Sequence, residues 1–219
     1  MKRAVLFDID GTLIDSNDGH AHAWVDSLAE HGHRIAFEQV RPLIGMGGDR
    51  VLSILVPGLE EGSPEGQAIA ETRMRIFKER YLPEVRPTRG ARELLEAVRA
   101  RGARVVMATS AKKAELDELL QKGGDLSELV DVASTSDDAG ASKPAPDIVE
   151  AALKKAKVSA DDAVMIGDTK YDVESAHRAK LRCVALLCGG NPKETLADAD
   201  AIYDDPGEVI AALDRAPFA

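Results

Sequence analysis

Two aspartates directly follow the first short apolar run of the chain. Asp8 and Asp10 lie in the segment FDIDGTL, just after AVLF. Burying carboxylates at the tip of an apolar strand is costly unless a cation or hydrogen-bond donors compensate for the lost hydration. In extended backbone, side chains two residues apart emerge on one side, and Gly11 allows a sharp turn just beyond them. The pair is therefore a candidate site for a shared divalent ion.

Hydroxyl and lysine side chains occur in two later segments. Thr109 and Ser110 end the run RVVMATS, where a hydroxyl can donate to a phosphoryl oxygen or can cap a helix that starts at Ala111. Lys143 lies in the loop segment SKPAP at 142–146, between a serine and a rigid proline. It is either a compact charge for an anion or a solvated surface lysine.

A second pair of aspartates follows another apolar run. Asp168 ends the strand-like run VMIG, and Asp172 lies four residues later on the first turn of the expected helix, where the helix dipole favours carboxylates. Taken alone, this pattern could be only a helix N-cap.

The elements that position these residues alternate along the chain. Strand-like runs are separated by amphipathic helical patterns, which predicts an α/β fold with a doubly wound, mostly parallel sheet covered by helices on both faces. The expected strands are RAVLFDI, RVVMATS, DVAST, AVMIGD, RCVALLC and DAIY. The expected helices cover 90–101, 112–122, 145–156, 170–179 and 206–213.

The polar segments all lie at the carboxyl ends of expected parallel strands, which is where open α/β sheets bind ligands. Four converging carboxylates would repel one another without a cation, whereas Mg²⁺ accepts hard oxygen ligands. We therefore expect a Mg²⁺ site at Asp8, Asp10, Asp168 and Asp172, with Thr109 and Lys143 facing the anionic group that the metal also holds.

One long segment departs from the alternation. Between about residues 16 and 83 no strand is convincing, whereas 17–31, 48–55 and 64–81 show helical spacing. We expect a catalytic core at 1–15 and 84–219 and a smaller helical domain at 16–83. The turn-rich segments at 15–17 and 82–87 would be the two linkers.

Charge and composition limit the classes of partner. The chain of 219 residues carries 38 acidic against 28 basic residues, a formal net charge of −10, which argues against nucleic acid or an anionic membrane. No apolar run approaches the roughly 20 residues that cross a bilayer, so we expect a cytoplasmic protein, either a monomer or a weak dimer. The two cysteines, five apart in one apolar stretch, are expected to face opposite sides of a strand and to form no disulfide.

The ordered motifs resemble those of the haloacid dehalogenase superfamily of aspartyl-phosphate enzymes. They are D-x-D-G-T at 8–12, the strand-terminal Thr109, S-K-P-x-P at 142–146 and G-D-T-x-x-D at 167–172. The inserted segment at 16–83 resembles the helical cap of the branch that contains phosphoglycolate phosphatases and β-phosphoglucomutase. The resemblance covers essentially the whole chain and implies a Rossmann-like core.

This resemblance implies a role for each motif residue. Asp8 would attack phosphorus, and Asp10 would act as general acid and base while its backbone carbonyl binds the metal. Thr109 and Lys143 would bind the phosphoryl group. Asp168 would bind Mg²⁺ directly, and Asp172 directly or through water. The implied activity is hydrolysis of a small phosphorylated metabolite.

Several cap residues are candidates for contacts with the rest of the substrate. In the inserted segment, His20 and the glycines at 45, 47 and 48 would contact it, together with Ser110 of the core, although Gly45, Gly47 and Gly48 could also simply form a turn before the helix at 48–55. Arg50, Arg73, Arg75 and Lys78 are further candidate anion contacts, although most are expected to be surface charges.

Three other functions are compared with this one on the same motifs. A sugar phosphomutase of the β-phosphoglucomutase type shares the core motifs and has a histidine where His20 stands, although His20 could also be a solvated residue at a helix start. The mutase cap loop resembles G-x-S-R, whereas GMGGDR here lacks the serine, which favours hydrolysis. A non-catalytic binding protein is disfavoured because every catalytic position is occupied, and a dehalogenase is disfavoured because it lacks the second aspartate.

Overall fold

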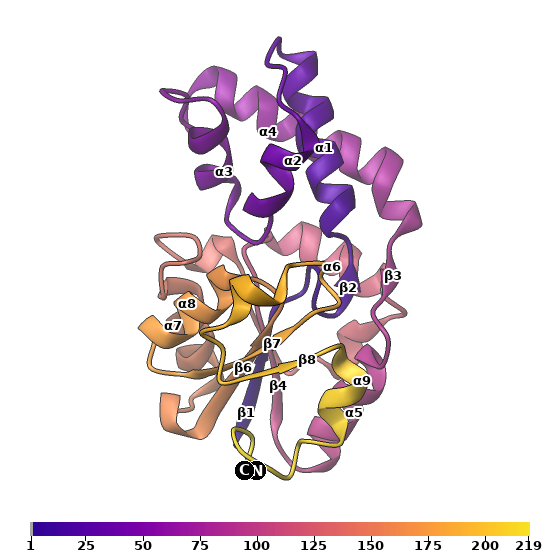
Figure 1. Ribbon diagram of the computed structural model, residues 1–219, viewed down its shortest axis with the longest axis vertical. Helices are drawn as coiled ribbons and strands as arrows, with labels where there is room; N and C mark the ends of the chain where they lie inside the picture. Colours follow the sequence, from indigo (N-terminus) through magenta and orange to yellow (C-terminus); the bar gives the residue numbers. More distant parts are fainter. Residues whose placement is uncertain (1) are drawn as a thin grey trace.

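The computed structural model describes residues 2–219 and has a six-stranded parallel sheet at its centre (Figure 1). The strand order is β5-β4-β1-β6-β7-β8, so the first strand of the chain lies in the middle of the sheet. The strands are β1 (Ala4–Phe7), β4 (Arg104–Ala108), β5 (Val132–Ser134), β6 (Ala163–Gly167), β7 (Arg182–Leu186) and β8 (Ala201–Tyr203). All six fall within the runs predicted from the sequence, and the predicted fold class is confirmed.

Helices cover both faces of this sheet, and each face has its own buried apolar cluster. One cluster joins α5 (Ala91–Ala100), α6 (Lys113–Lys122) and α9 (Pro206–Ile210) to the sheet. The other joins α7 (Asp147–Ala156) and α8 (Lys170–Arg178) to the opposite face. The predicted helix at 206–213 is wrong at its carboxyl end, because helix α9 stops at Ile210.

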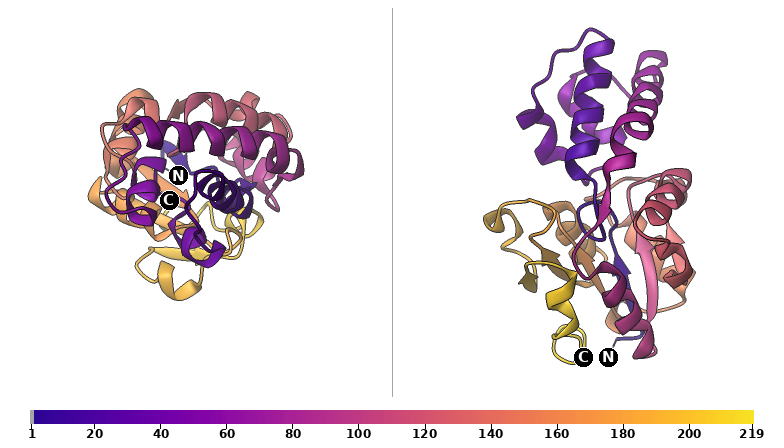
Figure 2. Two further views of the ribbon diagram at one scale, coloured as in Figure 1. Left: turned by 90° about the horizontal axis from the view of Figure 1, so that it is seen from above. Right: turned by 90° about the vertical axis from the view of Figure 1, so that its right-hand side faces the viewer.

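The helices between β1 and α5 form a group of their own beside the sheet (Figures 1 and 2). They are α1 (Asn17–Glu30), α2 (Phe37–Val40), α3 (Gly48–Leu55) and α4 (Pro64–Ile76), followed by a π-helix at Phe77–Tyr81. Trp24 and Leu28 of α1 pack with Leu52 of α3 and Ile69 of α4 in a third apolar cluster. The sequence patterns did not predict α2, which is a single turn.

Two strands outside the main sheet join the helical group to the sheet. β2 (Ile14–Asp15) pairs antiparallel with β3 (Arg86–Pro87), so the two segments expected to be linkers lie side by side as a short ribbon. Thr88 strengthens this pairing, because its backbone N–H donates to Leu13 O (3.0 Å) and its hydroxyl donates to Thr12 O (2.7 Å). The chain therefore leaves and re-enters the sheet region through one narrow, hydrogen-bonded connection.

Short 3₁₀ helices form most of the remaining turns. They lie at Arg41–Leu43, Leu82–Glu84, Leu126–Leu129, Ser136–Asp138, Ala160–Asp162 and Lys193–Leu196. Within residues 2–219 no helix has the length and apolar character that a membrane crossing requires. Cys183 and Cys188 are both free thiols, and they contact the apolar clusters on opposite faces of the sheet, as predicted.

Candidate active site

The sheet order brings the motif residues together. Because β1 pairs with both β4 and β6, the segments that follow these three strands lie next to one another at the carboxyl edge. Asp8, Thr109 and Asp168 stand just beyond these three strands, and all three are buried. Gly11 has φ +74°, and a Cβ there would lie 2.0 Å from Asn17 Nδ2, so the turn after Asp10 requires glycine.

Lys143 lies between two of the carboxylates. Its side chain is fully buried, and Nζ donates to Asp8 Oδ1 (2.6 Å) and to Asp172 Oδ1 (2.7 Å). Burial would lower the pKa of Lys143, but Asp172 and Asp8 outweigh it and raise the pKa well above its ordinary value. Lys143 is therefore a fixed positive charge in the site and not the solvated surface lysine of the alternative interpretation.

Asp8 is held in an environment that disfavours its charge. Burial raises its pKa well above the ordinary range, Lys143 opposes this shift, and Asp172 and Asp168 add to it. The neighbouring Asp172 is hydrogen-bonded to the residue that precedes α8. Both the backbone N–H (3.0 Å) and the hydroxyl (2.6 Å) of Thr169 donate to Asp172 Oδ2. The helix cap of the alternative interpretation is thus present, with Thr169 as the capping residue.

Asp168 receives hydrogen bonds from neutral donors only. Thr12 Oγ1 donates to Oδ1 (3.2 Å), while Asn17 Nδ2 (2.8 Å) and Asn191 Nδ2 (3.0 Å) donate to Oδ2. No ion pair reaches Asp168 from anywhere in residues 2–219. Burial, followed by the charge of Asp172, raises the pKa of Asp168 to about 7, despite the opposing hydrogen bonds from Asn17 and Thr12.

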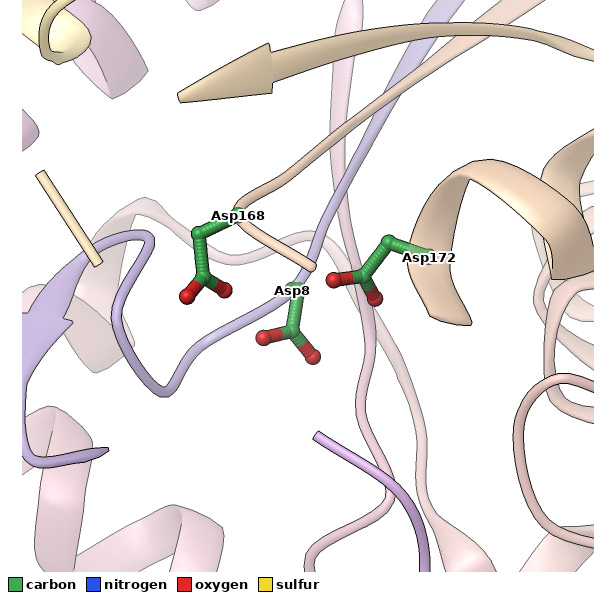
Figure 3. Close-up of side chains that lie close together, drawn as sticks. All are labelled: Asp8, Asp168 and Asp172. Atoms are coloured by element: carbon green, nitrogen blue, oxygen red, sulfur yellow. The ribbon is translucent and has the colours of Figure 1, made fainter. Parts of the chain in front are cut away.

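The carboxylates of Asp8, Asp168 and Asp172 lie close together (Figure 3). Asp8, Asp168 and Asp172 are buried, and one oxygen from each lies within 4.8 Å of the others. Lys143 binds Asp8 and Asp172 and is the only cation paired with the cluster within residues 2–219, so the three ionised carboxylates and this ammonium carry a net charge of about −2. Buried carboxylate oxygens that carry this uncompensated negative charge are suited to bind a hard divalent cation such as Mg²⁺.

The carboxylate of Asp10 lies apart from this cluster and is bound by the helical group. Its Oδ1 accepts hydrogen bonds from Ser16 Oγ (2.5 Å) and from His20 Nε2 (2.8 Å). Burial would raise the pKa of Asp10, but the charge and hydrogen bond of His20, with the hydrogen bond of Ser16, lower it overall. His20 is buried and stacks on Phe77 at 3.8 Å, so it is not a solvated residue at a helix start.

A small cavity opens onto Asp8 and Asp10. Its volume is about 50 Å³, and Thr109, Ser110 and His20 also line it. Since a cavity of roughly 10–15 Å³ admits one water, this cavity has room for a group of phosphoryl size. Thr109 Oγ1 accepts a hydrogen bond from Ala111 N (3.0 Å), which leaves its hydroxyl proton available to an anion in the cavity.

A larger cleft of about 530 Å³ continues from this cavity between the helical group and the core. Trp24, Gly48, Arg73, Ser110 and Glu115 line both spaces. Three of the basic residues expected as candidate anion contacts are ion-paired. Arg73 pairs with Glu115 (2.5 Å) and Lys78 with Glu118 (2.7 Å), both in α6. Arg75 pairs with Glu30 (3.0 Å).

The glycines at 45, 47 and 48 bring a loop of the helical group against the core. A Cβ at Gly45 would lie 2.6 Å from Thr169 Cγ2, and one at Gly47 would lie 2.0 Å from Ser142 Oγ. A Cβ at Gly48 would lie 3.3 Å from Trp24 Cζ2. Gly45 and Gly48 also line the small cavity, so the loop both packs on the core and borders the space for a ligand.

Several polar residues of the site were not singled out from the sequence. Thr12 lies inside the first motif, and Ser16 and Asn17 immediately precede or start α1. Because these residues closely follow Asp8 and Asp10 in the sequence, they could have been identified as candidates. Asn191 and Glu115 carried no such signal, because only the packing of distant segments brings them to the site.

A family model described as haloacid dehalogenase-like hydrolase matches residues 5–186. N-acetylmuramic acid 6-phosphate phosphatase of Pseudomonas aeruginosa is 31% identical, over 98% of this chain and 96% of its own length. Phosphoglycolate phosphatase of Rhodospirillum rubrum is 31% identical, over 94% of this chain and 88% of its own length. Protein SUPPRESSOR OF QUENCHING 1 of Arabidopsis thaliana is also 31% identical over 93% of this chain, but this chain spans only 19% of its length.

Solved structures show the same fold. The crystal structure of a hydrolase from Pseudomonas syringae has a TM-score of 0.88 and 29% identity, with 98% of each chain covered. The structure of CbbY from Rhodobacter sphaeroides in complex with phosphate has a TM-score of 0.82 and 26% identity, covering 98% of this chain and 100% of that one.

Proposed function

This chain belongs to the haloacid dehalogenase-like hydrolases, in the branch of phosphoglycolate phosphatases and β-phosphoglucomutase-like proteins, and we propose that it is a Mg²⁺-dependent phosphatase that works through an aspartyl-phosphate on Asp8. A phosphatase activity agrees with the names of its relatives. The metal, the covalent intermediate and the substrate class are parts of the proposal.

The observation that carries the proposal is the placement of Asp8. Its carboxylate lines the small cavity, next to Thr109, and is bound by Lys143 at 2.6 Å. Lys143 supports the ionised, nucleophilic form of Asp8 against the effect of burial. A carboxylate so oriented can attack the phosphorus of a bound ester in line, while Lys143 and Thr109 donate to the phosphoryl oxygens.

The reaction would proceed in two steps, transfer of the phosphoryl group to Asp8 and its hydrolysis. First, an Asp8 oxygen bonds to phosphorus, the bond to the leaving oxygen breaks, and Asp10 gives that oxygen a proton. Then water attacks phosphorus, Asp10 takes the proton of the water, and the bond to Asp8 breaks to release phosphate. In the free enzyme His20 lowers the pKa of Asp10 and so favours its ionised form. The negative charge of a bound phosphoester raises the pKa of Asp10 and so favours the protonated form that the first step needs.

The proposed metal ligands are Asp8 and Asp168, with Asp172 binding directly or through water and the backbone carbonyl of Asp10 as a further ligand. When bound, Mg²⁺ would neutralise charge on the phosphoryl oxygens during transfer. Thr12, Asn17 and Asn191 would orient Asp168 for this role, because their hydrogen bonds fix both of its oxygens.

We further propose that residues 16–83 act as a cap domain that selects the substrate, with 1–15 and 84–219 as the catalytic core. The adjoining cleft of about 530 Å³ is lined by both parts, so the group attached to phosphorus would lie there. Ser110, His20 and the loop that contains Gly45, Gly47 and Gly48 border the entry to the cavity. A small phosphorylated metabolite fits this arrangement, and the cytoplasmic location and the monomeric or weakly dimeric state remain predictions.

The test is phosphate release from a panel of phosphoesters, with Mg²⁺ or EDTA, by the wild type and Asp8→Asn. The panel includes phosphoglycolate, N-acetylmuramic acid 6-phosphate, pyrophosphate, a nucleotide and β-glucose 1-phosphate with its bisphosphate activator. Metal-dependent release that Asp8→Asn loses supports the proposal. Formation of glucose 6-phosphate without free phosphate would favour a mutase, and equal release by the variant would overturn the role of Asp8.

A further inference from the structure

A largely buried ion pair between Glu115 and Arg73 lies next to His20 and Asp10, and the reaction steps above do not use it. Glu115 of α6 is 4% exposed, and its Oε1 lies 2.5 Å from Arg73 Nη1 and 3.8 Å from His20 Nδ1. The other ring nitrogen of His20 is the one bound to Asp10. A carboxylate is seldom buried unless its partners compensate for the loss of water. Glu115 therefore has a structural partner in Arg73 and a second neighbour in His20.

The imidazole of His20 lies between the two carboxylates. Phe77 stacks on the ring with an interplanar angle of 14°, which sets the plane in which both nitrogens point. Nε2 faces Asp10, while Nδ1 is buried and has no hydrogen-bond partner within residues 2–219. Its neighbour Glu115 is the only charged group paired with that nitrogen in the described structure.

The four charged groups come alternately from the core and from the helical group. Asp10 follows β1 and Glu115 lies in α6, whereas His20 lies in α1 and Arg73 in α4. Arg73 also stacks over Trp24, with its Cζ 5.5 Å from the ring centroid, so the guanidinium is itself fixed. The order Asp10, His20, Glu115, Arg73 alternates in sign when His20 is charged, and it exists only while α4 lies against α6.

We propose that Glu115, held by Arg73, is a positioning residue that fixes His20 against Asp10 and so sets the acid and base steps of the reaction. This inference rests on the proposed function, because it assigns no role to Glu115 without Asp10 as the proton carrier. Glu115 borders the small cavity, but in this assignment it acts through His20 and makes no bond to the phosphoryl group. Its effect should fall on turnover, since Lys143 and Thr109 bind the phosphoryl group without it.

Helix α6 provides a matched control. Glu118 lies three residues after Glu115 and also pairs across the same boundary, with Lys78 (2.7 Å), but it is 38% exposed and has no contact with His20. Glu118→Gln therefore removes an ion pair between the same two parts of the molecule and leaves Asp10 and His20 unchanged. If Glu115 served only to hold the helical group on the core, the two variants should behave alike.

The experiment compares kcat and KM of Glu115→Gln and Glu118→Gln on the best substrate of the panel. We expect Glu115→Gln to lower kcat about tenfold or more with KM within about threefold, and Glu118→Gln to stay within about twofold of the wild type in both. Equal losses in the two variants, or a loss confined to KM, would overturn the assignment.

A change of leaving group distinguishes a specific effect on proton transfer by Asp10 from a general loss of activity. p-Nitrophenolate leaves without a proton, so Glu115→Gln should keep the rate of the first p-nitrophenol release and slow the later turnovers that need water activation. An alkyl phosphate should be slow in the first turnover as well. Equal slowing of the first turnover with both substrates would contradict the inference.

Two further variants test the same contact between Glu115 and His20. If Glu115→Gln does not fold, Glu115→Asp keeps the charge, withdraws the carboxylate by about one bond length (~1.5 Å) and should give the same pattern with a smaller loss. In a double-mutant cycle with His20→Gln, the two losses should not add, because both act through one contact. Activity lost in Asp8→Asn but unchanged in Glu115→Gln would refute this inference alone, whereas an active Asp8→Asn would refute the proposed function.

Discussion

Within residues 2–219, Lys143 is the one cation that pairs with the carboxylate cluster. It is fully buried and binds both Asp8 and Asp172, so removing its ammonium leaves two buried carboxylates without a cation. Lys143→Met should lower the free energy of unfolding by about 3–5 kcal/mol in EDTA, measured by urea denaturation. Lys112→Met is the control, since Lys112 is exposed, and its effect should stay within about 0.5 kcal/mol. A similar small effect for Lys143→Met would contradict the assigned pairing.

The same cluster predicts how pH and metal affect stability. In the metal-free protein, burial raises the pKa of Asp8, and it raises that of Asp168 to about 7, so the folded state keeps protons that the unfolded chain loses near pH 4. The free energy of unfolding in EDTA should therefore fall as pH rises from about 4 to 7. Mg²⁺ needs the ionised carboxylates, so the rise in melting temperature that it causes should be small near pH 5 and large near pH 8.

Thermal unfolding with Mg²⁺ or EDTA across this pH range checks that prediction. Asp168→Asn serves as the control, because it removes one ligand and its titration together, and its melting temperature should respond weakly to Mg²⁺ at every pH. A Mg²⁺ effect in the wild type that does not change with pH would show that no proton is displaced from the cluster.

At the scale of elements, the turn between β1 and β2 determines the shape of the site. Gly11→Ala would place a Cβ 2.0 Å from Asn17 Nδ2 and 2.3 Å from Asp168 Oδ2. Gly102 has nearly the same φ (+77°) but nothing within 4 Å of its Cβ position. Gly102→Ala should therefore cost about 1–2 kcal/mol for the left-handed backbone alone. Gly11→Ala should cost at least about 1 kcal/mol more and should also weaken Mg²⁺ binding.

Urea denaturation of both variants and Mg²⁺ titration by calorimetry measure the two effects. If Gly11→Ala and Gly102→Ala were equally destabilised and bound Mg²⁺ equally well, the close packing of the turn on Asp168 would not matter for the site.

The main sheet could be predicted from the sequence because each strand is a short apolar run followed by a polar motif, and this local pattern has few alternative explanations. The ribbon of β2 and β3 could not, because each strand has two residues and the pairing joins segments about 70 residues apart. The site shows the same division. Asp8, Lys143 and Asp168 stand in recognisable motifs, whereas Asn191 and Glu115 reach the site only through the packing of distant helices and loops.

At the scale of the whole molecule, we propose that the helical group opens from the core to exchange substrate and product, since one narrow connection and several side-chain ion pairs join the two parts. Lys78 and Glu118 face each other across this boundary, and both are partly exposed. Cysteines at these two positions, joined by a short cleavable disulfide linker, should reduce steady-state turnover at least about tenfold, and reduction should restore it.

The native cysteines should not interfere with that experiment. Cys183 is fully buried, and burial raises the pKa of Cys188 to about 12, so neither is a ready thiolate near neutral pH. Single-cysteine variants treated with the same reagent are the control for modification alone. Full turnover in the cross-linked enzyme would contradict the need for opening.

The central claim, a covalent phosphoenzyme on Asp8, can be tested directly. The enzyme is acid-quenched during turnover with Mg²⁺ and then treated with borohydride, which reduces an acyl phosphate to an alcohol, and peptide mass mapping locates the change. The account predicts homoserine at position 8 in the wild type, more of it in Glu115→Gln when p-nitrophenyl phosphate is the substrate, and none in Asp8→Asn or without substrate. An enzyme that turns over its substrate yet gives no reduced residue at position 8, or gives it at another carboxylate, would contradict the account.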